Sequence, residues 1–260
     1  MIFDPKSYWD DRLKVNYNLT GVGSISLSAN YNKWSYKVTR KVLSRLVKKH
    51  LRGDKVLDVG SGTGYIVETM KLLNKQVTGV DISNAAVKNL KLKYPQFQFY
   101  EVSLGEELIP VNDNSFDGVV AASVLYHIVD DFKFEAALKD LHRVIKKDGI
   151  FIFSDNFIRT KSFTITHQKC RTLSEYESIL AKAGFEIIDR TSNFVLMNNP
   201  VDAESLFYPR IWKILTGLSA RSVFLDKLIW PLIYPIELLL TSIIKDSPAQ
   251  EFMICKVKKG

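Results

Sequence analysis

The chain has 260 residues, of which 46% are hydrophobic and 25% charged, and a net charge of +8 at pH 7. This composition indicates a globular protein that needs no disulfides, while the charge alone leaves nucleic acid, anionic lipid and phosphorylated substrates open as partners. Cys170 and Cys255 lie far apart without metal-ligand spacing, which fits a reducing compartment. The first residues contain an early acid and no long apolar run, so no signal peptide is expected and a cytoplasmic protein is predicted.

The first fifty residues predict a helical cap in front of a larger domain. Residues 1–35 are polar and aromatic and include a glycine-containing loop at 20–26 that is expected to be flexible. Residues 36–50 have apolar side chains at helical spacing and a basic opposite face, which predicts an amphipathic helix.

From Lys55 onward, strand-like and helix-like segments alternate. Apolar, β-branched or aromatic runs predict strands at 55–60, 76–81, 97–102, 116–123, 150–155, 185–192 and 251–259. Helical spacing predicts helices at 64–73, 83–94, 132–147 and 173–184. Such alternation requires a mostly parallel sheet with helices on both faces, and these sheets bind ligands at the carboxyl ends of their strands.

A long segment separates the sixth and seventh predicted strands. It runs over residues 193–248, far beyond the usual few residues of such connections, and contains helix-like stretches at 203–218 and 225–244. The second stretch is the most apolar of the chain. Two prolines, three charged residues and fewer than about 18 uninterrupted apolar residues argue against a membrane span.

Three alternating glycines follow the first strand. Gly60, Gly62 and Gly64 allow a tight turn and a close approach of a ligand, and the helix that begins there offers free N–H groups. The spacing fits the nicotinamide-binding pattern G-x-G-x-x-G in neither register. Together with Asp58 it reads D-x-G-x-G-x-G, which resembles the first motif of class I S-adenosylmethionine-dependent methyltransferases.

The resemblance extends from about residue 51 to 190 and resumes at the last strand. Asp81 ends the second strand, where this family uses a carboxylate to hold the ribose hydroxyls. Residues 109–128, 140–155 and 173–188 are similar to the family's fourth to sixth strands and the helices between them. The resemblance implies a Rossmann-like three-layer α/β/α sandwich. Its seven-stranded sheet is mostly parallel with an antiparallel last strand, and here a helical insert lies between strands six and seven.

The cofactor implied by the resemblance is S-adenosylmethionine, with S-adenosylhomocysteine as its product. The implied binding residues are Asp58, Gly60, Ser61, Gly62, Gly64, Asp81, Ile82, Ser103 and Leu104. One departure concerns the adenine, because the family usually has an acid soon after strand three. This chain has Ser103 and Leu104 near that place, so Glu101 and Glu106 remain alternatives.

Loops at the ends of the later strands hold the candidates for catalysis and acceptor binding. His127, after strand four, is either a general base or a residue that packs over the cofactor, and His167 is a second candidate base. The candidate acceptor residues are Tyr31, Tyr126, Asp155, Asn156 and Arg171. The Asp155–Asn156 pair is similar to one in cation-dependent methyltransferases, but strand four ends without an acid, so no metal site is expected.

The position of the insert limits its role. In the class I pattern, strand seven starts from the face on which strand six ends, so the insert must leave and return on one side. A helical lid over the site and a hairpin at a membrane interface both remain open, the latter through residues 200–246. The predicted parts are a cap (1–50), a cofactor-binding core (51–192), a lid insert (193–248) and a last core strand (249–260).

The predicted function is methyl transfer from S-adenosylmethionine to a small-molecule or lipid-linked acceptor, most simply O-methylation of a sugar or natural-product hydroxyl. No motif of amino-methylating DNA enzymes follows strand four and no RNA-binding module is appended, so a nucleic-acid partner is not expected. Two alternatives remain, an RNA methyltransferase and a cofactor-binding protein without turnover. The sequence does not predict the oligomeric state.

Overall fold

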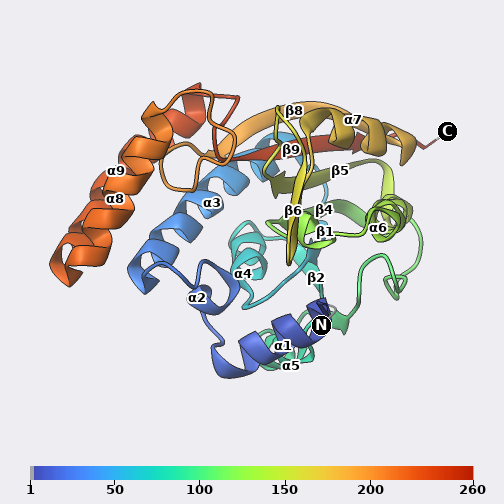
Figure 1. The fold of residues 1–260 in the computed structure, drawn as a ribbon. Coiled ribbons are helices and arrows are strands. Elements are labelled where there is room, and N and C mark those ends of the chain that lie inside the picture. Colours follow the sequence, from blue (N-terminus) through green and yellow to red (C-terminus); the bar gives the residue numbers. More distant parts are fainter. Residues whose placement is uncertain (1–2, 260) are drawn as a thin grey trace.

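The computed structural model describes residues 3–259 and contains a seven-stranded sheet covered by helices on both faces (Figure 1). The strands of this sheet are β1 (Lys55–Val59), β2 (Gln76–Asp81), β3 (Gln98–Glu101), β4 (Phe116–Ala122), β5 (Ile145–Asp155), β8 (Phe185–Phe194) and β9 (Gln250–Val257). The helices that alternate with them are α4 (Tyr65–Leu72), α5 (Asn84–Lys93), α6 (Asp131–Val144) and α7 (Leu173–Lys182).

Strand pairing gives the sheet one antiparallel member. The spatial order is β3-β2-β1-β4-β5-β9-β8. The first five strands pair in parallel, while β9 runs antiparallel to both β5 and β8. The strand order reverses between β1 and β4, and ligands bind such sheets at this switch point. The predicted Rossmann-like α/β/α class with an antiparallel last strand is confirmed.

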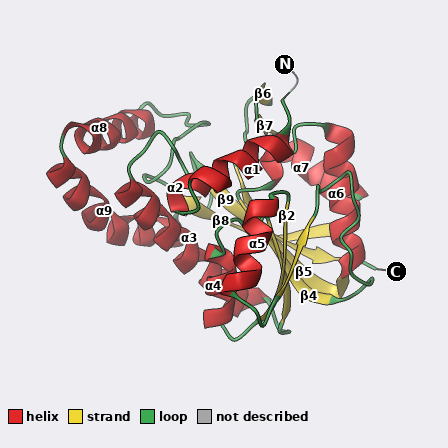
Figure 2. Cartoon of the chain, turned by 90° about the horizontal axis from the view of Figure 1, so that it is seen from below, coloured by secondary structure: helices red, strands yellow, loops and turns green. Residues whose placement is uncertain are grey.

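Alternate side chains of the central strands enter two separate hydrophobic layers. Phe151 and Phe153 of β5 pack with residues of α6 and α7, whereas Ile150 and Ile152 pack with residues of α4, α5 and the N-terminal segment. Figure 2 shows the sheet between these two helical layers. The layers hold the strands in place, so the loops at their carboxyl ends have a rigid support.

The fifth strand begins earlier than its sequence predicts. A helix was expected over 132–147, but α6 ends at Val144 and Ile145 already pairs with Phe116 of β4. The ladder is then interrupted, and Asp148 adopts a left-handed conformation with φ of 61° before pairing resumes at Ile150. Burial of Ile145 in the sheet therefore overrides the helical spacing of this stretch.

Two short elements also differ from expectation. The loop at 20–26 begins with a helical turn, α2 (Leu19–Val22), which is capped by the Asn18 side chain. A small hairpin of β6 (Phe163–Ile165) and β7 (Gln168–Cys170) follows β5. Each of its strands has three residues, which is too short to leave a periodic signal in the sequence.

The N-terminal segment forms α1 (Pro5–Val15), α2 and the long helix α3 (Ala29–His50). Helix α1 is attached to the N-terminus of α5 through Asp10. The Asp10 carboxylate accepts hydrogen bonds from the Ala85 N–H (2.8 Å) and the Ser83 hydroxyl (2.9 Å). A carboxylate is favoured at a helix N-terminus, so electrostatics as well as packing fix this segment over the core.

The insert between β8 and β9 forms a helical hairpin of α8 (Phe207–Arg221) and α9 (Val223–Ile243), which projects from one end of the sheet (Figure 1). Helix α9 packs on α3, where buried Trp230 contacts Tyr31. The buried Glu237 carboxylate accepts hydrogen bonds from the N–H groups of Val195, Leu196 and Met197 after β8 (2.7–3.2 Å). Among residues 3–259, no helix combines the length and apolarity that a bilayer crossing requires.

Candidate functional site

The loop after β1 has a backbone conformation that residues other than glycine rarely adopt. Gly60, Gly62 and Gly64 have φ values of 70°, 51° and 81°, in the left-handed region. A Cβ atom at Gly60 would also lie 2.4 Å from Val124 Cγ2. The loop leads directly into α4 and lies at the switch point of the sheet.

Asp81, the last residue of β2, faces this loop. Its carboxylate accepts hydrogen bonds from the N–H groups of Gly62 (2.7 Å) and Ser83 (2.8 Å). Burial raises the pKa of Asp81, and the two N–H donors oppose this shift by stabilising the ionised form. The carboxylate thus ties the loops after β1 and β2 together, and it retains lone pairs for a ligand.

A cavity of about 420 Å³ lies between these loops and α1, and we call it the first cavity. Its size is typical of sites for small molecules and cofactors. Six of the residues expected to bind the cofactor line it: Gly60, Gly62, Asp81, Ile82, Ser103 and Leu104. Ser61 lines a neighbouring cavity, while Asp58 and Gly64 line neither.

The two acids that remained open for the adenine lie in different environments. Glu106 lines the first cavity and forms an ion pair with Lys133. Glu101 lies outside the lining, where it accepts a hydrogen bond from Asn84 and pairs with Lys6 (2.7 Å). Glu101 is therefore occupied by contacts within the chain.

Asp58 is fully buried beside the glycine loop, and neither carboxyl oxygen has a hydrogen-bond partner among the described residues. Burial raises the pKa of Asp58 to about 8. A buried polar group without a partner costs free energy. This unsatisfied carboxyl lies two residues before Gly60 but lines neither cavity.

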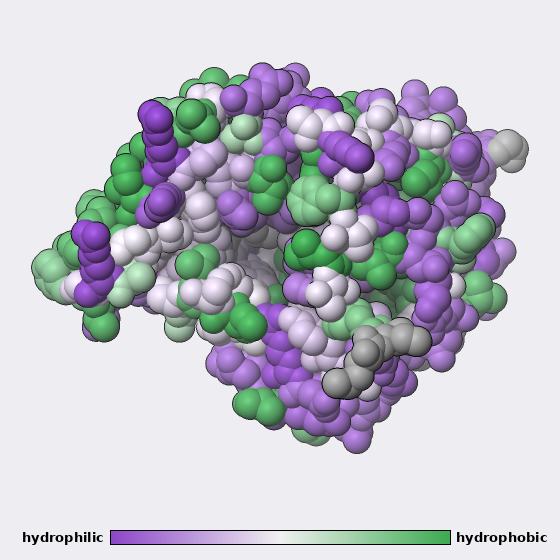
Figure 3. All heavy atoms as spheres, in the orientation of Figure 1, coloured by the Kyte–Doolittle hydropathy of each residue, from purple (hydrophilic) through white to green (hydrophobic). Residues whose placement is uncertain are grey.

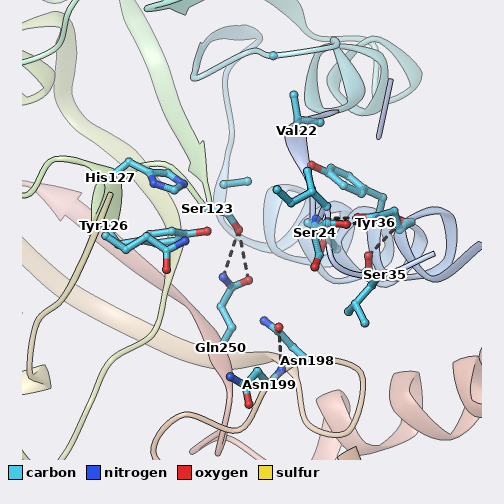
Figure 4. A pocket seen from close by; sticks show the side chains of 18 of the residues that line it. Val22, Ser24, Ser35, Tyr36, Ser123, Tyr126, His127, Asn198, Asn199 and Gln250 are labelled. Carbon is cyan, nitrogen blue, oxygen red and sulfur yellow. Dashed lines mark hydrogen bonds between the residues drawn. The ribbon is translucent and has the colours of Figure 1, made fainter. Parts of the chain in front are cut away.

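A second cavity of about 580 Å³ adjoins the first. Residues lining both are Trp9, Val22, Tyr36, Gly60, Gly62, Ala122, Ser123 and His127. Figure 4 shows Ser123 and His127 on one side of this space and Ser24 and Tyr36 on the other. The junction between the cavities is therefore built by the end of β4 and the N-terminal segment.

Ser123 is held at this junction in an uncommon conformation. Its φ of 60° is left-handed for a residue with a side chain, and such strain often marks functional positions. The Ser123 N–H donates to the Ser154 hydroxyl (2.9 Å), and the Gln250 amide donates to the Ser123 hydroxyl (3.1 Å). These contacts from β5 and β9 fix the turn after β4.

The hairpin of β6 and β7 brings His167 onto His127. The His127 Nδ1 atom lies 2.8 Å from the His167 carbonyl oxygen, and the two rings stack with centroids 5.7 Å apart. Because a carbonyl only accepts, Nδ1 carries the proton and Nε2 is free to accept another. Burial lowers the pKa of His127 to about 4, so the ring is neutral at pH 7.

The lining of the second cavity is polar but nearly uncharged. Among the described residues of this lining, Arg12 has the one charged side chain, and its guanidinium donates to the Tyr8 hydroxyl (3.0 Å) and to the carbonyls of Thr20 (3.3 Å) and Gly23 (2.5 Å). Hydroxyl and amide groups supply most other polar atoms, among them Ser24, Tyr36, Ser123, Asn198, Asn199 and Gln250 (Figure 4). The cavity offers hydrogen bonds to a neutral ligand and no carboxylate to a cation.

The structure separates the five candidate acceptor residues. Tyr31, Tyr126 and Asn156 line the second cavity. Asp155 does not, because it is buried beneath the sheet edge and accepts hydrogen bonds from the Tyr176 hydroxyl and the Asn156 N–H. The expectation for Asp155 is corrected accordingly.

Arg171 also lies away from both cavities. It is 1% exposed, donates to the Asp131 carboxylate and the Ile128 carbonyl (both 2.9 Å), and its guanidinium lies 3.8 Å from the Phe134 ring centroid. These contacts make Arg171 a structural residue between the β6–β7 hairpin and α6. The expectation that it binds an anionic acceptor group is corrected.

Two groups of lining residues were not predicted from the sequence. Trp9 and Arg12 reach the cavities only because α1 folds back over the core, which leaves no local signal. Asn198 and Asn199 lie soon after β8, and two amides at the carboxyl end of a strand were a usable signal. Within residues 3–259, no cluster of three or more His, Cys, Asp or Glu side chains is arranged to hold a metal ion.

The chain is similar to known methyltransferases in sequence and in fold. Residues 57–153 match the family model described as "Methyltransferase domain". A "Probable S-adenosylmethionine-dependent methyltransferase" of Mycolicibacterium smegmatis is 29% identical over 191 residues, which cover 71% of this chain and 72% of the relative. The chain belongs to the class I S-adenosylmethionine-dependent methyltransferases.

Solved structures of methyltransferases share the fold. A TehB-like enzyme of Corynebacterium glutamicum superposes with a TM-score of 0.55 at 16% identity, covering 97% of this chain and 99% of its own. An N1-methyltransferase of Burkholderia thailandensis with bound S-adenosylhomocysteine gives 0.55 at 17% identity, covering 87% and 81%. The cofactor of this methyltransferase is S-adenosylmethionine.

Proposed function

We propose that this methyltransferase methylates a hydroxyl of a neutral, polyhydroxylated acceptor, such as a sugar or a glycosylated natural product, free or lipid-linked. The lining of the second cavity carries the proposal. Its about 580 Å³ are lined by hydroxyl and amide groups among aromatic and aliphatic side chains. Arg12, which has the one charged side chain among the described lining residues, donates hydrogen bonds to neutral oxygen atoms. Such groups pair with the hydroxyls of a sugar, whereas a cationic acceptor finds no carboxylate in this lining.

The residues of the first cavity fit the cofactor. Asp81 offers carboxylate lone pairs to a ribose diol, the loop at Gly60 and Gly62 admits close backbone approach, and Ser103 and Leu104 flank the position expected for the adenine. When bound, S-adenosylmethionine supplies an electrophilic methyl group. The chain must then orient the acceptor hydroxyl and exclude water.

His127 is the candidate proton acceptor for this reaction. Methyl transfer to a hydroxyl forms a carbon–oxygen bond, breaks the methyl–sulfur bond and releases the hydroxyl proton. Nε2 of His127 is unprotonated at the junction of the cavities, because Nδ1–H is used by the His167 carbonyl. A pKa of about 4 makes the ring a weak base, so it holds the released proton only until the product leaves and solvent enters, and it contributes chiefly by position.

The proposal is tested by transfer of labelled methyl groups from S-adenosylmethionine with the full chain. The panel contains neutral glycosides and hydroxylated natural products, aliphatic amines, and RNA. We expect label in a base-stable methyl ether of the neutral class. Label confined to RNA or amines, or none in any class, contradicts the proposal.

A matched pair of variants links turnover to the second cavity. Asn198→Ala removes an amide from its lining and is expected to raise the acceptor KM about tenfold, the effect of about one hydrogen bond. Asn89→Ala, on the exposed face of α5, is the control and is expected to leave KM unchanged. Equal KM values for both variants contradict acceptor binding in this cavity.

A further inference from the structure

Helix α9 has both of its acidic side chains turned inward. Its four buried residues are Asp226, Trp230, Glu237 and Thr241. The Asp226 carboxylate accepts hydrogen bonds from the hydroxyls of Ser28 (2.7 Å) and Ser219 (2.6 Å) and from the Trp230 indole (2.9 Å). Glu237 is similarly saturated by backbone N–H groups, so both acids of this helix serve the protein interior.

The opposite side of α9 is apolar and exposed. Its stripe consists of Phe224 (70% exposed), Leu228 (43%), Leu232 (66%), Ile236 (48%), Leu239 (59%) and Ile243 (67%). Spacings of three or four residues place these side chains on one helical face, and at 1.5 Å per residue the stripe is about 28 Å long. A continuous stripe of this length differs from scattered surface hydrophobics and indicates a partner that covers it.

The exposed charges of the hairpin have one sign. Between residues 206 and 245 the exposed charged side chains are Arg210, Lys213, Arg221, Lys227 and Lys245. Both acids of this span are buried, and the next acid, Asp246, pairs with Arg159 (3.0 Å) and Arg190 (2.8 Å). Figure 3 shows green, hydrophobic side chains along the outer edge of the hairpin with purple, hydrophilic ones beside them.

We propose that the outer face of the α8–α9 hairpin docks on an anionic lipid surface. The apolar stripe enters the boundary between headgroups and acyl chains, and the cations contact the headgroup phosphates. The hairpin lies along the surface, since no helix within residues 3–259 has the length and apolarity to cross. A second copy of the chain fits less well, because a two-fold contact would bring the five cations of each copy together.

The docking face shares helix α8 with the second cavity. Trp212 and Thr216 of α8 line the cavity, whereas Phe207 and Ile214, on the other side of this helix, are exposed. The cavity therefore lies about one helix diameter, about 10 Å, from the docking face. Docking would bring a lipid-linked acceptor close to the second cavity, and this consequence rests on the proposed function. The docking itself does not depend on the proposed function.

Vesicle sedimentation of the full chain tests the docking. We expect binding to vesicles of phosphatidylcholine with phosphatidylglycerol, much weaker binding to phosphatidylcholine alone, and weakening by added salt. Leu232→Glu with Leu239→Glu places charge in the stripe and should weaken binding at least about 100-fold. Lys213→Glu with Lys227→Glu should weaken binding about 30-fold or more.

Matched controls change the same residue types on α5, away from the hairpin. Leu92→Glu alters an 82% exposed leucine, and Lys88→Glu with Lys91→Glu makes the same change in net charge. All variants should keep the melting temperature and the affinity for S-adenosylhomocysteine, because every altered side chain is exposed. Equal losses in controls and hairpin variants, or no binding to either vesicle, overturn the proposal. So does a dimer in solution that Leu232→Glu dissociates.

Discussion

Asp81 joins two loops and faces the first cavity, so its loss affects both the loops and a ligand. Asp81→Ala removes a carboxylate expected to hold the ribose and leaves two N–H groups without their acceptor. We expect affinity for S-adenosylhomocysteine, measured by calorimetry, to fall about 100-fold, corresponding to about 3 kcal/mol for charge-assisted hydrogen bonds. Glu101→Gln, just outside the lining, is the control, and equal affinities for both variants exclude the ribose role.

His127 is expected to act on turnover and not on cofactor affinity. His127→Asn should lower kcat about 100-fold, typical of a lost general base, and leave affinity for S-adenosylhomocysteine within about threefold. His142→Asn on α6 is the control. Because burial lowers the pKa of His127 to about 4, its ring is unprotonated from pH 5 to 8, and its contribution falls only as the pH approaches 4. If the pH profile of kcat has an inflection near pH 6.5 that is absent in His127→Asn, the lowered pKa of His127 is contradicted.

The sequence predicts single residues well where backbone geometry requires them. Gly60 and Asp81 have the predicted positions because the strand–loop–helix pattern defines them locally. Asp155 ends a predicted strand and Arg171 lies in the loop before a predicted helix, but the side chain of Asp155 is buried against Tyr176 and that of Arg171 against α6. Which side of a loop a side chain takes depends on neighbours far away in the sequence, so a strand end alone does not reveal it.

Helix α9 supports the loop that lines the second cavity. Glu237→Ala leaves the buried N–H groups of Val195, Leu196 and Met197 without an acceptor. We expect urea denaturation to show a loss of about 3 kcal/mol in the free energy of unfolding, and the acceptor KM to rise because Asn198 follows this loop. Glu204→Ala, an exposed change in the same insert, should alter neither quantity. An unchanged free energy of unfolding in Glu237→Ala would contradict this structural role of Glu237.

Helices and strands were predictable where the periodicity of their own residues determines the structure. The alternating strands and helices of the core follow the sequence, whereas the start of β5, the β6–β7 hairpin and α1 depend on pairing and docking. The insert was expected as two helices, and the structure shows them packed on α3 by Trp230 and Glu237. An apolar run in the sequence does not reveal which of its residues turn inward, so the exposed stripe of α9 was not predictable.

Buried acids make the stability of the whole molecule depend on pH. Burial raises the pKa of Asp155 to about 7 from an ordinary value of 3.8. The unfolded chain therefore loses this proton first, and the contribution of Asp155 to stability is full below pH 4 and is lost as the pH rises to 7. Asp155→Asn should gain stability relative to the natural chain over this interval, by up to about 4 kcal/mol. Urea denaturation at pH 4 and pH 7 measures the difference, and a gain that does not grow with pH contradicts the raised pKa.

At the scale of the whole molecule, the proposed function depends on the two adjoining cavities. The first is formed by the loops after β1, β2 and β3, and the second by the N-terminal segment, the end of β4 and the insert. Methyl transfer between them requires the reacting groups to meet at the junction near Ser123 and His127. A crystal structure of the chain with S-adenosylhomocysteine tests this most directly. The account predicts the ribose hydroxyls on Asp81 and the sulfur facing the second cavity at this junction. A ribose away from Asp81, or a sulfur directed away from the second cavity, would contradict it.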